Sequence, residues 1–258
     1  MIDLPLGVAG FGTVLLLCGF AVGGLALVRR RVLPRLVHGE GDAEFSGAMV
    51  HSVMVFYGLA LALISVDVWQ RYGHAEGIVS NEATALAMLY RDAGGYPEPT
   101  RSQLQGEIRG YTEHVIREAW PLQRKGEVPS GGVALMNQLQ TALFTFQPST
   151  ESQGLLHGEA LNAYNRLIEA RRLRLDAVET HLPGVMWTVI VLGALISVST
   201  SFFFRVKDPR LHVTLVLFLA SFIGLVIFLT MVLDRPFQGH LALSPRPYQL
   251  VYDQLMSH

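Results

Sequence analysis

Four long stretches of this 258-residue chain carry almost no charge, and they constrain its fold more than any other feature. They run from Leu4 to Val28, from Phe45 to Val66, from Gly184 to Phe204 and from Leu211 to Leu233. Each reaches the ~20 apolar residues with which a helix crosses the ~30 Å hydrocarbon core of a bilayer. The sequence therefore predicts four transmembrane helices. The first has no basic segment before it, so we expect it to stay in the mature protein.

Composition narrows the class of protein further. Charged residues make up 16% of the chain, against ~25% in a typical soluble domain, and the net charge of -1 argues against binding to nucleic acid. One cysteine, Cys18, excludes a disulfide framework and a cysteine metal cluster. The nine histidines lack metal-ligand spacing, and no P-loop, G-x-S-x-G or H-E-x-x-H motif is present. We therefore expect no enzyme, no metal and no cofactor.

Basic residues are concentrated in two short loops, and this distribution predicts the orientation. The loop after the first stretch holds Arg29, Arg30, Arg31 and Arg35, and the loop before the fourth holds Arg205, Lys207 and Arg210. Basic residues in short loops favour the cytoplasmic side. We expect both termini and the long insert to lie on the other side. The arginines of the insert before the third stretch argue the opposite way, but long segments cross membranes largely regardless of charge.

The insert between the second and third apolar stretches reads as a bundle of helices. Helical spacing and the Gly/Pro tracts predict helices over about 67–92, 100–120, 133–146 and 150–181. The predicted fold class is an all-α membrane protein with two plus two transmembrane helices and a helical-bundle soluble insert. The predicted divisions are 1–66 with a cytoplasmic loop at 29–44, the insert at 67–182, the second helix pair at 183–234, and a C-terminal tail at 235–258.

Charged residues interrupt the apolar faces of these predicted helices. Glu82 lies in a stripe with Ile78 and Leu86, and Arg171 lies in another with Leu161, Tyr164, Ile168 and Leu175. An unpaired buried ion costs several kcal/mol, so we predict that Glu82 or Glu118 pairs with Arg171 or Arg172. Arg91 is included in this network. The network either fixes the register of the helices or coordinates and gates ions, and both readings stay open.

Two further groups of residues point to the membrane. His51, Val55 and Leu59 share a face of the second stretch that could line a narrow pore or pack against another helix. Asp67 and Arg71 are spaced as an interfacial ion pair, and Trp69 suits the aromatic belt at the membrane surface. Asp234-Arg235-Pro236-Phe237-x-Gly239 is expected to end the fourth helix at the interface.

Several short motifs occur in an order typical of one family. They are Trp69 with Ala75; Val79-x-x-Glu82-Ala83; Leu89-Tyr90-Arg91; Tyr111 with Val115-Ile116; Glu118-Ala119-Trp120-Pro121; Ala170-Arg171-Arg172-Leu173-Arg174; Leu182-Pro183 with Trp187; and Asp234-Arg235-Pro236-Phe237-x-Gly239 with Ser244-Pro245. From about residue 45 to 250 the chain resembles the bestrophin-like domain family. The resemblance implies a multi-pass protein of the bacterial plasma membrane and, more distantly, an oligomeric bestrophin-type anion channel. Bestrophins hold their large domain in the cytoplasm, opposite to the side that the loop charges predict.

Three functions are compatible with these features. The first is a homo-oligomeric channel for an anion or another small ion. The insert has 11 basic and 14 acidic residues, a net charge of -3, and the identity of the ion therefore stays open. The second is a membrane-anchored structural or interaction protein whose insert binds a partner. The third is a stator-type proton channel subunit, which would keep the insert in the cytoplasm.

Overall fold

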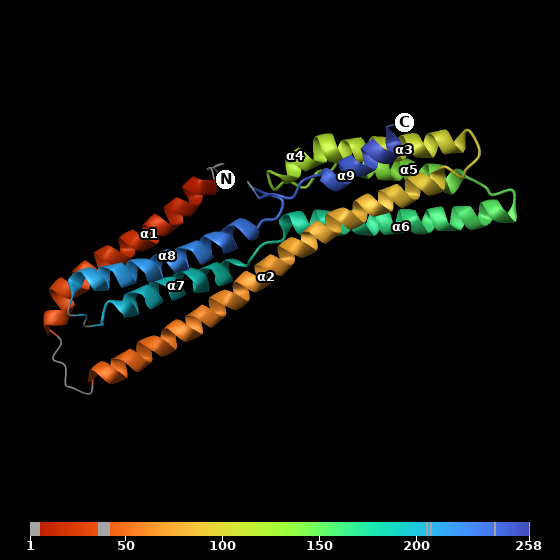
Figure 1. Cartoon of the computed structure of the whole chain (residues 1–258). Coiled ribbons are helices and arrows are strands. Elements are labelled where there is room, and N and C mark those ends of the chain that lie inside the picture. The colour runs from red at the N-terminus through yellow and green to blue at the C-terminus, as the bar shows by residue number, and fades with distance from the viewer. Residues whose placement is uncertain (1–5, 36–41, 205, 207, 240, 258) are drawn as a thin grey trace. The chain divides into compact units, whose positions relative to one another are not determined.

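The computed structural model describes residues 6–35, 42–204, 206, 208–239 and 241–257. Throughout this part of the chain the regular structure is helical (Figure 1). The chain divides into two compact units. The apolar unit comprises the described residues up to Arg71 together with His181–Asp234. The polar unit comprises Tyr72–Thr180 together with the described residues from Arg235 onward.

The apolar unit contains the four apolar stretches found in the sequence. Its helices are α1 (Leu6–Leu27), the first part of α2 (Asp42–Ala93), α7 (Gly184–Ser201) and α8 (Pro209–Leu233). All four are long and apolar enough to cross a membrane. Within this unit α8 packs against both α1 and α7 (Figure 1). A π-helical turn, Val28–Val32, and a 3-10 turn, Leu33–Arg35, extend α1 and carry its arginines. Arg205 and Lys207 of the other basic loop lie outside the described residues.

Close packing and a few polar contacts join the helices of the apolar unit. The ring of Tyr57 on α2 lies against Gly193 of α7, where a Cβ atom would stand 2.4 Å from the ring. Its hydroxyl donates a hydrogen bond of 3.0 Å to the carbonyl oxygen of Ile190. The hydroxyls of Ser65 and Thr230 lie 3.0 Å apart and join α2 to α8. Small residues and hydrogen bonds of this kind hold helices together in lipid, where there is no hydrophobic driving force between them.

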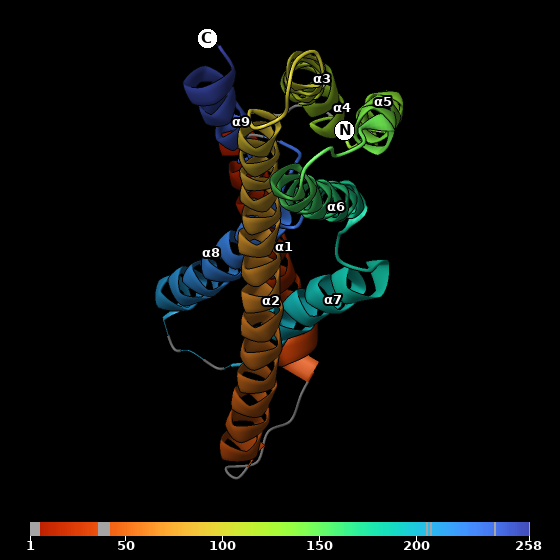
Figure 2. The ribbon, with the colours of Figure 1, turned by 90° about the vertical axis from the view of Figure 1, so that its right-hand side faces the viewer.

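The second helix is the longest element of the chain. α2 runs for 52 residues without a proline (Figure 2). At 1.5 Å per residue it is about 78 Å long, more than twice the ~30 Å of hydrocarbon. Leu61, Val68, Ala75, Glu82 and Leu89 recur every seven residues along it, and all five are buried. One side of α2 is therefore packed in both units, and the expected helix over 67–92 is its direct continuation.

The remaining helices form the polar unit. They are α3 (Thr100–His114), a π-helical turn (Val115–Ala119), α4 (Trp120–Gln123), α5 (Gly132–Thr145), α6 (Glu151–Glu179), α9 (Arg246–Val251) and a second π-helical turn (Tyr252–Met256). The core of the unit takes fully buried residues from four of its helices: Leu86, Ile108, Leu139 and Leu167. As expected, α6 begins after Thr150, whose hydroxyl accepts a hydrogen bond from the backbone N–H of Gln153.

Two segments differ from the sequence-based expectations. The helix expected to stop at Pro121 continues to Gln123, because proline fits the first turn of α4, where its missing N–H is not needed. The segment expected as a C-terminal tail contributes buried residues to the core of the polar unit, among them Phe237, Tyr248 and Met256.

Candidate functional site

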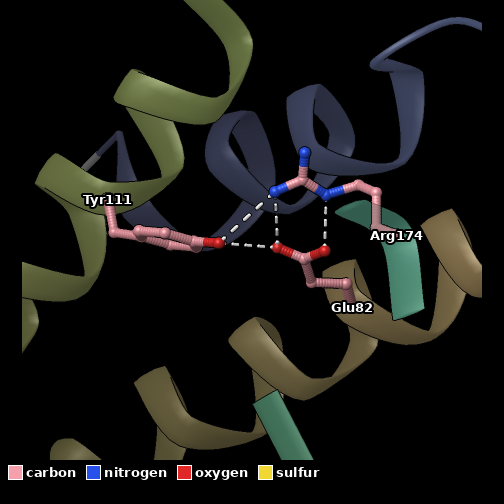
Figure 3. Close-up of polar contacts among 3 residues, drawn as sticks. All are labelled: Glu82, Tyr111 and Arg174. Atoms are coloured by element: carbon pink, nitrogen blue, oxygen red, sulfur yellow. Dashed lines mark hydrogen bonds and ion pairs between the residues drawn. The ribbon is translucent and has the colours of Figure 1, made fainter. Parts of the chain in front are cut away.

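A carboxylate–guanidinium pair lies at the centre of the polar unit. Glu82 comes from α2 and Arg174 from α6, with side chains 0% and 2% exposed. The Nε of Arg174 donates to Oε2 of Glu82 at 2.6 Å, and its Nη2 donates to Oε1 at 3.2 Å. Tyr111 of α3 donates its hydroxyl to the same Oε1 at 2.7 Å (Figure 3). Three helices are therefore joined by one carboxylate. We call Glu82, Tyr111 and Arg174 the buried triad.

The surroundings of the triad keep Arg174 protonated and Tyr111 neutral. Burial disfavours the charged form of Arg174, but attraction to Glu82 and the neighbouring tyrosines outweighs this, so the pKa of Arg174 lies above its usual value. Burial, and then the negative charge of Glu82, raises the pKa of Tyr111. The pKa of Tyr248, fully buried nearby, is raised well above its ordinary value by the same two causes. Both tyrosines are thus neutral, and Tyr111 donates to the carboxylate, an arrangement suited to holding helices together.

The two terminal nitrogens of the Arg174 guanidinium differ in their hydrogen bonds. The buried Nη1 of Arg174 has no hydrogen-bond partner in the part of the chain that the structure describes. The Cζ atom of Arg174 lies over the ring of Tyr248, 5.9 Å from its centroid. A cation over an aromatic face is attracted by the ring quadrupole, and this contact brings α9 to the triad.

The partner of Glu82 differs from the one expected. The sequence predicted Arg171 or Arg172, whereas the structure places Arg174 there, one helical turn further on. Of the expected stripe of Leu161, Tyr164, Ile168 and Leu175, Tyr164 is buried and the other three are not. The buried face of α6 instead follows Ala160, Ala163, Leu167, Ala170 and Arg174. Alanines lie on this face because their small side chains allow close packing. A stripe predicted from the large apolar residues of α6 therefore falls about one position away from the face that is buried.

The other residues of the expected network lie away from the triad. Arg171 is half-buried with its guanidinium against Gly132, whereas Arg91 and Arg172 are exposed. The side chain of Glu118 is 71% exposed, and its Oε2 lies 2.9 Å from Nδ1 of His114. Only Glu82 of the predicted network belongs to the buried ion pair. Among the described residues, no three His, Cys, Asp or Glu side chains gather closely enough to hold a metal ion.

The residues predicted to lie at the membrane interface, Asp67, Trp69, Trp120 and Asp234-Arg235-Pro236-Phe237-x-Gly239, fall into two groups that we call the interface motif. In the apolar unit, Asp234 ends α8 and accepts two hydrogen bonds, from the backbone N–H of Leu182 at 2.7 Å and from the indole of Trp187 at 3.2 Å. It thereby ties the end of α8 to the segment that begins α7. Asp67 and Arg71 form the expected ion pair at 2.9 Å, half-exposed. Trp69 is 67% exposed on α2.

The second part of the motif lies in the polar unit. The indole N–H of Trp120 donates to the carbonyl oxygen of Leu243 at 3.1 Å. Its ring centroid lies 5.7 Å from those of Phe237 and Tyr248. Arg235 donates to the side chain of Gln238 at 3.1 Å, and Gly239 has a φ of +80°, which glycine adopts without strain. Pro236 follows Arg235 and leads into this aromatic cluster; its carbonyl accepts from the backbone N–H of Leu243 at 2.8 Å.

The candidate pore-lining residues are exposed in the single chain. Val55 and Leu59 are 51% and 58% exposed, and His51 is also exposed. All three lie on the part of α2 that belongs to the apolar unit. They are turned away from Tyr57 and Leu61, which pack against the other helices of that unit. This placement is compatible with a lining of a shared pathway between copies of the chain.

A buried histidine that was not among the predicted site residues joins α7 and α8 in the apolar unit. His212 is 4% exposed, and its Nε2 lies 3.0 Å from the carbonyl oxygen of Ser201, so it links the start of α8 to the end of α7. Its place near the beginning of an uncharged stretch was the signal available. His51 lies deeper in its own stretch, where an ionisable side chain gives a stronger signal.

These features define a helical membrane protein with an apolar unit, a polar unit and one helix that runs through both. The bestrophin-like domain matches residues 15–248, and the chain belongs to the bestrophin-like family. The resemblance seen in the sequence is thereby confirmed.

Two solved structures share the fold. One is a membrane protein crystallised as a point mutant, 10% identical to this chain. The other is a mutant of a bacterial bestrophin homologue from Klebsiella pneumoniae, 12% identical. Each has a TM-score of 0.71 and covers 96% of this chain and 99% of its own. At such low identity the similarity shows the fold alone. No curated protein matches the chain significantly.

Proposed function

We propose that the chain forms a homo-oligomeric ion channel in the membrane, with α2 lining the pathway. The observation that carries this proposal is the open side of α2. Leu59, Val66, Gly73 and Ser80 recur every seven residues, and all four are exposed. They lie on the side opposite to the buried series that includes Glu82. A cyclic oligomer brings the same face of each copy around one axis, and an open face that continues from Leu59 to Ser80 suits such a lining.

The apolar part of this face supports a gate. Val55 and Leu59 are aliphatic and exposed, and a ring of such side chains closes a narrow pore by expelling water. His51 lies one turn before Val55, and an ionisable group inside a membrane segment is usually functional. The buried triad supports the channel indirectly, because it fixes the rotation of α2 within the polar unit.

Ion flux in liposomes tests the proposal. The purified protein should conduct, and Val55→Ser should raise the resting flux because a hydroxyl favours water in the constriction. Phe56→Ser is the matched control. Phe56 is 73% exposed and adjacent to Val55, but it is turned about 100° away around the helix. Absence of flux at every pH and voltage would overturn the channel proposal, and equal effects of the two substitutions would remove α2 from the pathway.

A groove in the polar unit favours the alternative, a membrane-anchored protein that binds a partner. It has a volume of about 550 Å³ and lies between α3 and α5, lined by amide and hydroxyl side chains such as Gln103, Asn137 and Thr141. Thr141→Arg would fill it. A partner that is retained by the full-length protein and lost with this substitution, together with absent conductance, would favour the alternative.

We propose the orientation that the short-loop charges favour, with the polar unit and both termini outside the cytoplasm. Single cysteines at Arg30 and Glu151, in a Cys18→Ser background, test it, because both positions are exposed. A membrane-impermeant maleimide added to intact cells should label the cysteine at 151 and spare the one at 30. The reverse pattern would place the polar unit in the cytoplasm, as in bestrophins and in the stator reading.

A further inference from the structure

Among the side chains of α2 that the structure describes, from Gly47 to Ala93, the open side carries one carboxylate. Glu76 lies three residues after Gly73 and four before Ser80, so helical periodicity places it on their face. The other acidic residues of this region are already engaged. Asp67 pairs with Arg71 at 2.9 Å, and Glu82 is buried against Arg174.

The surroundings leave the Glu76 side chain free to act on mobile ions. Its neighbours on the face, Gly73, Gly77 and Ser80, are small. Glu76 is exposed, and within the described part of the chain it forms no ion pair. It borders a groove of about 630 Å³ in the polar unit.

Two basic residues, Arg246 and Arg91, could offset the effect of the Glu76 charge on nearby ions. Arg246 borders the same groove but belongs to α9, so it opposes Glu76 from outside the α2 face. Arg91 is exposed fifteen residues further along α2, which is about 22 Å at 1.5 Å per residue. At physiological salt the Debye length is about 8 Å, so Arg91 is largely screened from an ion beside Glu76.

We propose that Glu76 makes the pathway selective for cations. The inference rests on the proposed channel with α2 around its axis. Symmetry would repeat Glu76 as a ring of carboxylates, and such rings select cations in other channels. One unit charge 5 Å from an ion in water changes the local concentration of that ion about four-fold, in opposite directions for cations and anions. A ring adds the effects of its members, and salt reduces them.

Permeability ratios measured on the full-length protein in liposomes test the role of Glu76. Under a potassium chloride gradient the wild type should prefer potassium, and Glu76→Gln should lower the potassium-to-chloride ratio at least about four-fold. Glu169→Gln is the matched control, because it makes the same change at an exposed position of α6. Ser80→Glu adds a carboxylate to the same face and should raise the ratio, and Arg246→Gln should raise it as well. These two variants test the same proposal even if Glu76→Gln does not fold.

The outcomes separate this inference from the channel proposal. A wild type that conducts but prefers chloride would overturn the role of Glu76 and leave the channel intact. A conducting wild type whose ratio responds equally to Glu76→Gln and Glu169→Gln, or not at all to Ser80→Glu, would do the same. A wild type without flux would remove the channel itself, and cation selection with it.

Discussion

Arg174 and Glu82 depend on each other, because either one alone would be a buried charge without a partner. We expect Glu82→Leu or Arg174→Met alone to lower the free energy of unfolding by about 3–5 kcal/mol. The double variant should recover most of this loss, since replacing both members of a buried pair by apolar side chains is often neutral. Thermal unfolding in detergent, followed by circular dichroism, measures the order of stabilities.

Arg172→Met is the control for this series, because Arg172 is exposed on the same helix and should change stability by less than about 0.5 kcal/mol. A double variant as unstable as the single ones would contradict the pairing. Conductance of the folded double variant separates the two roles of the triad. Unchanged ion flux assigns it to helix register, and altered flux or ion dependence assigns it to gating.

Asp234 is the second residue whose loss should be costly. Its carboxylate accepts from the backbone N–H of Leu182 and from the Trp187 indole, and hydrogen bonds to a charged group contribute about 1.5–3 kcal/mol each. Asp234→Ala should therefore lower the melting temperature clearly and shift the fluorescence of Trp187. Asp67→Ala removes a half-exposed ion pair and should cost under about 1 kcal/mol. Equal melting temperatures for the two variants would contradict the role of Asp234 in joining the end of α8 to the segment before α7.

At the residue scale the sequence identified Glu82 but not its partner. A carboxylate inside an apolar stripe is visible in any helical projection, and its burial could be predicted. Arg174 was hidden because the stripe that buries it contains Ala160, Ala163 and Ala170, whose small side chains give a weak periodic signal. The roles of Trp120 and Phe237 depend on contacts between segments more than a hundred residues apart, which spacing along one helix does not reveal.

Gly126 decides how the loop after α4 can turn. It has a φ of +81°, and a Cβ there would stand 2.4 Å from the side-chain nitrogen of Gln238. Gly126→Ala should therefore destabilise the protein by roughly 1–2 kcal/mol. Gly110→Ala, in the interior of α3 where nothing lies within 4 Å of the new Cβ, should instead stabilise it by up to about 1 kcal/mol. Melting temperatures that move in the same direction for both variants would contradict this assignment.

The helices themselves were largely predictable, and their limits were less so. Four uncharged stretches need only length and composition to be recognised, and each coincides with a helix. The start of α6 could be predicted at Thr150, whose hydroxyl caps the first turn of the helix. Pro121 led to a wrong helix end, because proline breaks the interior of a helix but is tolerated in its first turn. The π-helical turn before it, Val115–Ala119, could not be recognised from its amino-acid composition.

For the whole molecule, the open side of α2 predicts association of several copies. A single chain has a mass of 28.4 kDa. Light scattering of the protein in mild detergent should give a mass that is a multiple of this value after correction for detergent. Chemical cross-linking in the native membrane should give the same multiple. A monomer by both measurements would leave the face of Leu59 and Ser80 without a pathway to line.

The attachment of α2 inside the polar unit has a mechanical consequence. Glu82 of this helix accepts hydrogen bonds from Tyr111 of α3 and from Arg174 of α6, so α2 cannot turn about its own axis there without breaking both contacts. A molecule that bound the polar unit would therefore have to move α2, α3 and α6 as one body.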